Sequence, residues 1–65
     1  MYLRLIIDEI IKESGLKNEY IARKVGVSVR TLYKWRKNET IPRLDQAIKL
    51  ANLLDCKVND LYVYK

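Results

Sequence analysis

The sequence contains no histidine, and its 65 residues include only one cysteine, one proline and two glycines. The single thiol, Cys56, cannot close a disulfide within the chain, and a zinc site would need carboxylates alone, so we expect no disulfide, metal or other cofactor. Scarce glycine and proline, together with 49% hydrophobic residues, are typical of a compact helical chain. Stability must therefore come from packing within one small domain over residues 1–65.

Long apolar segments are also missing. The apolar run from Leu5 to Ile7 lies between the charged residues Arg4 and Asp8. A membrane-spanning helix needs about 20 consecutive apolar residues, and the N-terminus lacks the apolar stretch and cleavage site of a secretory signal. We therefore expect no membrane association and a cytoplasmic location.

Groups typical of catalysis are equally scarce. The chain has no histidine and no glycine-rich phosphate loop, and its acidic pair Asp8 and Glu9 is adjacent on an exposed helix face. We expect neither enzymatic activity nor a small-molecule ligand.

Positive charge is present, and it is concentrated in the middle of the chain. The net charge is +5, with eight basic and two acidic residues between Lys17 and Arg43 and five basic and six acidic residues elsewhere. A basic region between nearly neutral ends favours a polyanionic partner such as nucleic acid. The alternative is an ordinary solvated surface.

Hydrophobic spacing divides the chain into about five short helices. The first ends at Gly15 and is expected to bury a stripe at three- and four-residue spacing, namely Leu3, Ile6, Ile7, Ile10 and Ile11. A second helix spans about Asn18 to Val25 and is broken by Gly26. Its inward residues are Ile21, Ala22 and Val25.

A third helix is predicted to begin after Ser28, a good N-cap residue. Leu32 and Trp35, three residues apart, are expected to face the core. The outward residues are then Val29, Arg30, Tyr33, Lys34 and Lys37.

The rest of the chain predicts a loop and two further helices. Asn38 to Pro42 forms the loop. The fourth helix is expected to bury Leu44, Ala47, Ile48, Ala51 and Leu54, and Val58 and Leu61 indicate a short fifth helix. The expected fold class is all-α, a compact bundle of short helices.

The order and spacing of these residues are similar to those of a known family. The matching positions are Gly15-Leu16, Asn18-Glu19, Ile21-Ala22, Val25 to Ser28, Thr31-Leu32, Trp35, Pro42, Leu50-Ala51 and Leu61. In this pattern the chain resembles the helix-turn-helix domain of the phage repressor and Cro family of transcription regulators, with the helix-turn-helix at about residues 18–37. The resemblance implies a prokaryotic or phage-encoded regulator that binds double-stranded DNA.

The resemblance also implies roles for individual residues, because the recognition helix, residues 28–37, would enter the major groove. Carried over by position, the base contacts are Val29, Arg30 and Lys34, with Tyr33 at the flank. Arg30 can bond guanine O6 and N7 together, and Val29 can pack on a thymine methyl. The implied phosphate contacts are Lys17, Asn18, Ser28, Lys37 and Arg43.

Some positions depart from the family pattern. Lys17, Arg43 and Lys57 stand where polar N-caps are usual, and we expect Lys17 and Arg43 to offset this loss by contacting phosphate. The family's buried arginine–glutamate pair cannot form, because its positions hold Ile11 and Arg36. Arg36 is then free to meet Glu13, Glu39 or a phosphate.

Two positions where the family usually has glycine are also changed. Asn38 and Asp55 replace the usual glycines after the third and fourth helices, and both residue types tolerate left-handed geometry.

A homodimer is expected, because specific binding usually takes two half-sites. Its surface would come from the C-terminal segment, that is, the fifth helix and the tail Leu61 to Tyr64, unless this tail folds back on the core.

A different class of function uses the same fold. An antitoxin-like or adaptor domain would bind an acidic protein without reading DNA. The exposed cluster of Arg30, Lys34 and Lys37 favours DNA, because a domain of that kind has little need for it.

Overall fold

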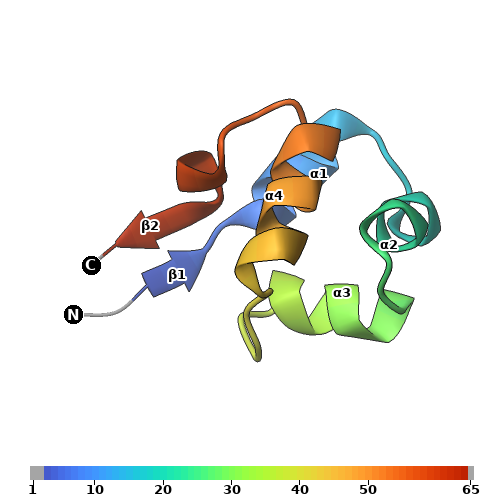
Figure 1. Cartoon of the computed structure of the whole chain (residues 1–65), viewed down its shortest axis with the longest axis horizontal. Coiled ribbons are helices and arrows are strands. Elements are labelled where there is room, and N and C mark those ends of the chain that lie inside the picture. The colour runs from blue at the N-terminus through green and yellow to red at the C-terminus, as the bar shows by residue number, and fades with distance from the viewer. Residues whose placement is uncertain (1–2, 65) are drawn as a thin grey trace.

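The structure, a computed structural model, describes residues 3–64 as four α-helices, one 3₁₀ helix and a two-stranded sheet (Figure 1). The elements in chain order are β1 (Leu3–Leu5), α1 (Ile7–Ser14), α2 (Asn18–Val25), α3 (Val29–Arg36), α4 (Leu44–Leu53), η1 (Val58–Leu61) and β2 (Tyr62–Tyr64). No helix in this described range is long and apolar enough to cross a membrane. The chain is mainly helical, as expected.

The two ends of the chain differ from the sequence-based expectation. The expected first helix included Leu3, but the structure places Leu3–Leu5 in a strand and begins α1 at Ile7. The expected fifth helix is instead the short 3₁₀ helix η1, followed by β2. Four of the about five expected short helices are therefore α-helices, and the fifth is not confirmed as one.

Backbone hydrogen bonding explains why the helix begins late. β1 and β2 are antiparallel, with Arg4 opposite Val63, and the N–H of Ile6 donates to the carbonyl of Leu61 at 2.8 Å. The side chain of Asn38 accepts from the Leu5 N–H at 2.7 Å and donates to the Leu5 carbonyl at 2.9 Å. These partners occupy the groups that a longer α1 would need for its own ladder.

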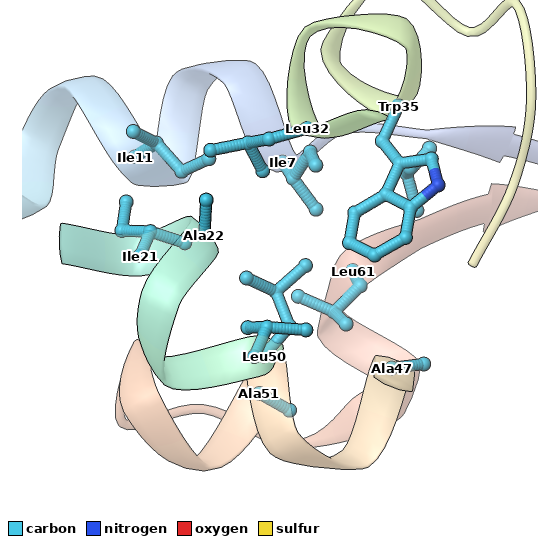
Figure 2. Close-up of a cluster of buried hydrophobic side chains, with 12 residues drawn as sticks. Ile7, Ile11, Ile21, Ala22, Leu32, Trp35, Ala47, Leu50, Ala51 and Leu61 are labelled. Atoms are coloured by element: carbon cyan, nitrogen blue, oxygen red, sulfur yellow. The ribbon is translucent and has the colours of Figure 1, made fainter. Parts of the chain in front are cut away.

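The core is one cluster to which nearly every element contributes (Figure 2). Its buried residues are Leu5, Ile7, Ile11, Ile21, Ala22, Val25, Leu32, Trp35, Ala47, Leu50, Ala51 and Leu61. Leu32 and Trp35 point from α3 into this cluster, which confirms the role predicted for both. Ile6 and Ile10, expected in the core, are only half-buried.

The buried face of α4 differs from the expected one. Ala47, Leu50 and Ala51 face the core, whereas Leu44 and Ile48 are 71% and 43% exposed. Leu50 takes the centre of the buried stripe and the small alanines flank it, which rotates Leu44 and Ile48 to its solvent edge. The expectation that both would be buried was wrong.

The C-terminal segment folds back on its own chain. Leu61 is fully buried, and Tyr62 is half-buried against the core. For Leu61 and Tyr62, the alternative in which the segment folds back on the core is therefore confirmed. The side chains of Leu3 and Tyr64 lie outside the described part of the structure.

Candidate nucleic-acid interface

A tight turn joins α2 to α3 and sets the angle between them. Gly26 adopts φ 89°, a left-handed conformation that is open to glycine at little cost, and its N–H donates to the Ala22 carbonyl at 2.8 Å. Ser28 Oγ then accepts from the Thr31 N–H at 3.1 Å, which confirms Ser28 as the N-cap of α3. In Figure 1, α3 lies along one border of the molecule, with α2 at its beginning.

The outer side of α3 carries a surface that we call the basic face, defined by Arg30, Tyr33, Lys34 and Lys37. All four are exposed and recur at three- and four-residue spacing, opposite the buried Leu32 and Trp35. Within residues 3–64, no carboxylate lies within salt-bridge distance of the three cations. Their charge therefore remains available to an anionic partner.

Val29 is placed differently from the other residues expected to read bases. It was expected to point away from the core, but it is half-buried and packs against it. Val29 directly follows the N-cap Ser28, so it begins α3 next to the turn. Only the unburied part of its side chain is accessible beside Arg30.

The residues expected to contact phosphate lie at helix ends. Lys17 and Arg43 are the N-cap residues of α2 and α4, and neither side chain caps its helix. Gln46 compensates in part, because its Oε1 accepts from the Arg43 N–H at 2.9 Å. Arg43 also forms an exposed ion pair with Asp45 at 3.4 Å. The first-turn N–H groups of α2, in contrast, have no side-chain cap from Lys17.

Arg36 has a partner that the sequence did not suggest. Its Nε donates to Asp8 Oδ1 on α1 at 2.6 Å, and its Nη1 donates to Asn18 Oδ1 on α2 at 2.6 Å. Asn18 Nδ2 in turn donates to the hydroxyl of Tyr33 at 3.1 Å. Glu13 and Glu39, the partners considered from the sequence, form no ion pair with Arg36 among the described residues.

Asp8 is the anionic end of this network. Its other oxygen pairs with Lys12 at 3.1 Å, one helical turn away. The hydrogen bond from Arg36, and then that from Lys12, hold the pKa of the Asp8 carboxyl below its ordinary value of 3.8. The carboxylate therefore stays charged near neutral pH, and its bond with Arg36 links α1 to α3.

The structure thus brings most of the expected site residues to one side of the molecule. Asn18 and Tyr33 are in direct contact across α2 and α3, and Arg30, Lys34 and Lys37 share the basic face. Arg43 is separated from them by the loop after α3. The departure at Ile11 and Arg36 was noticed from the sequence, but Asp8 and Asn18 were not foreseen as the partners of Arg36.

Comparison with known proteins identifies the family. A family model described as helix-turn-helix matches residues 7–61. An uncharacterized HTH-type transcriptional regulator of Archaeoglobus fulgidus is 31% identical over 62 residues, which cover 95% of this chain and 89% of that protein.

Two solved structures share the fold. A candidate DNA-binding protein from Bacteroides fragilis has a TM-score of 0.89 at 27% identity, covering 95% of this chain and all of the other. The phage P22 c2 repressor, crystallised with a synthetic operator, has a TM-score of 0.78 at 24% identity, covering 89% and 92%. Because the family model extends from the start of α1 to the end of η1, the chain belongs to the helix-turn-helix family of the phage repressor and Cro type.

Proposed function

We propose that this chain is a transcription regulator that binds double-stranded DNA in a sequence-specific way. The observation that carries the proposal is the basic face, whose three cations lie on the outer side of the second helix of a helix-turn-helix. The major groove admits one α-helix, so α3 can lie in it with this face toward the bases. The P22 c2 repressor, which has this fold, was crystallised with operator DNA.

Within α3, each accessible side chain has a distinct role. Arg30 lies in the first turn, where its planar guanidinium can bond guanine O6 and N7 together. Lys34 lies one turn later and can contact a base, and Tyr33 lies at the flank of this surface. The accessible part of Val29 can pack on a thymine methyl. Arg30 is therefore the main determinant of sequence preference.

Phosphate contacts would surround this reading surface. Lys17 and Asn18 lie at the start of α2, where free N–H groups and the helix dipole attract anions. Ser28 and Lys37 stand at the two ends of α3, and Arg43 begins α4. A cation at a helix N-terminus interacts unfavourably with the helix dipole. A phosphate bound at Lys17 or Arg43 would make the local interaction favourable.

A homodimer completes the proposal, because a single recognition helix reads few base pairs and two half-sites lie about 34 Å apart. The C-terminal segment supplies one surface. Within the described chain β2 pairs only with β1, so its second edge can accept a strand from another copy. A regulator of this kind works on DNA in the prokaryotic cytoplasm.

A second surface is favoured by a specific observation. Ile41, Leu44 and Ile48 are large apolar residues that are 60%, 71% and 43% exposed, near the start of α4. They adjoin the loop that follows α3, and in a two-fold pair such a patch would meet its own copy. Two chains per bound duplex are expected in either arrangement.

The proposal is tested by salt titration of binding to random-sequence duplex DNA and to a duplex selected by the chain itself. Arg30→Ala should lose about 1–3 kcal/mol of preference for the selected duplex. Lys37→Ala should weaken binding to both duplexes alike and flatten the slope of log K against log salt by about one unit. Sedimentation of the complex gives the number of chains per duplex.

Lys49→Ala is the matched control, because Lys49 is an exposed cation on α4, outside the basic face. It should leave sequence preference unchanged. If the chain binds neither duplex at low salt, DNA binding is excluded and a protein partner for the basic face becomes the leading explanation.

A further inference from the structure

Three hydrogen bonds in series connect α1 to the basic face. They run from Asp8 on α1 to Arg36 on α3, from Arg36 to Asn18 at the start of α2, and from Asn18 to the hydroxyl of Tyr33. Arg36 is 14% exposed, whereas Tyr33 is 46% exposed on the surface assigned to DNA. A side chain that is nearly buried thus sets the environment of one that is open to a partner.

The chemistry of the groups fixes the direction of every bond. A guanidinium only donates hydrogen bonds, so the atom of Asn18 that faces Arg36 must be the carbonyl oxygen Oδ1. The amide nitrogen Nδ2 then faces Tyr33, and because it only donates, the Tyr33 oxygen must accept. The hydrogen of the Tyr33 hydroxyl is therefore not used within this series and can be donated to an acceptor outside it.

The guanidinium of Arg36 donates to two different residues. It gives Nε to Asp8 and Nη1 to Asn18 at equal distances of 2.6 Å. A pair that served only to join α1 and α3 could place two parallel bonds on the carboxylate, which is the geometry that arginine usually prefers. Here one arm orients the Asn18 carboxamide instead.

We propose that Arg36 is a positioning residue for DNA binding, which orients Asn18 so that the Tyr33 hydroxyl donates its hydrogen to a DNA phosphate oxygen. Phosphate oxygens only accept, and tyrosine hydroxyls are among their usual donors. Without Arg36 the carboxamide can rotate, Oδ1 can take the tyrosine hydrogen, and the donor is lost to DNA. The inference rests on the proposed function and names an additional residue that serves it.

A double-mutant cycle on the selected duplex tests the assignment. Tyr33→Phe should weaken binding about tenfold through loss of one bond to a charged acceptor. Arg36→Met should weaken binding by a similar factor in the wild-type background and by clearly less in the Tyr33→Phe background, because its effect passes through the hydroxyl. Lys37→Met, which removes one cation from the same helix, should act equally in both backgrounds.

Thermal unfolding is measured for every variant, since Arg36 also joins α1 to α3. If Arg36→Met is not folded, Asn18→Leu takes its place in the same cycle, because it breaks the link to Tyr33 and leaves the Asp8–Arg36 pair intact. An equal effect of the Arg36 or Asn18 substitution in both backgrounds would overturn the inference, as would wild-type affinity of Tyr33→Phe. Failure of the unmodified chain to bind the duplex would instead count against the proposed function.

Discussion

At the scale of single residues, Ser28 shows which features of the site follow from local sequence alone. A serine directly before a helical pattern predicts an N-cap, and the structure confirms the bond from the Thr31 N–H. Leu32 and Trp35 were predicted equally well, because their spacing depends only on helix geometry. Arg36 was not predictable in this way, because its partner Asp8 lies 28 residues away and only the folded chain brings them together.

Ser28 has two roles that substitution can separate. Ser28→Ala should lower the free energy of unfolding by about 1 kcal/mol, through loss of the cap. For a domain of this size, that change lowers the melting temperature by about 4–8 °C. Circular dichroism on heating measures the loss.

Ser28→Asp provides the matched comparison. Aspartate accepts the same N–H and suits the positive end of the helix dipole, so stability should be retained or improved. Its negative charge would repel a nearby phosphate, so DNA affinity should fall. Wild-type DNA affinity of a stable Ser28→Asp variant would place Ser28 away from phosphate.

At the scale of elements, the helices were predicted better than the strands. The α2–turn–α3 unit was expected at about residues 18–37, and α2 and α3 lie at 18–25 and 29–36. β1 was mistaken for the start of a helix, since Leu3 lies three and four residues before Ile6 and Ile7 and therefore also fits a helical stripe. What decides the outcome is Asn38 and the returning C-terminal strand, and neither is visible from the local pattern.

Asn38 makes this element-scale argument testable, because its backbone and its side chain contribute separately. Its φ of 62° confirms the predicted left-handed position, and its carboxamide holds both backbone groups of Leu5. Asn38→Gly keeps the backbone relaxed but loses these bonds, which should cost about 1–3 kcal/mol. Asn38→Ala loses them too and adds strain of about 1–2 kcal/mol.

The expected order of stability is therefore wild type, then glycine, then alanine, measured by urea unfolding. A glycine variant as stable as the wild type would show that the hydrogen bonds to Leu5 contribute nothing, and that Asn38 is kept for its backbone alone. Asp55, at φ 57°, is the control position. Asp55→Gly should be neutral or slightly stabilising there.

At the scale of the whole molecule, the small size of the chain makes every element depend on the same core. The twelve residues of the core cluster come from β1, all four α-helices and η1, so no part of the described structure has a core of its own. This explains why the burial of Leu61 and Tyr62 in this chain's own core could not be derived from the sequence. A partner chain or this chain itself could bury these residues. Pairing with β1 decides between the two, because it holds the C-terminal segment against its own chain.

A shared core predicts that the ends and the helix-turn-helix unfold together. Leu61 is fully buried near the C-terminal end of the chain, whereas Trp35, the single tryptophan, lies in α3 and is 2% exposed. Leu61→Ala should cost about 2–5 kcal/mol, against the roughly 3–5 kcal/mol that a core of this size supplies. Urea unfolding is followed by Trp35 fluorescence and by far-ultraviolet circular dichroism.

Both signals should give one midpoint, shifted equally to lower urea, because Leu61 and Trp35 belong to the same core cluster. Val63→Ala is the matched control, since Val63 lies two residues farther on in β2 and is only half-buried. It should shift the midpoint much less. An early transition in dichroism that leaves Trp35 fluorescence unchanged would mean that the strand pair and η1 open as a separate unit, and that the surface formed by α2 and α3 does not depend on the chain's ends.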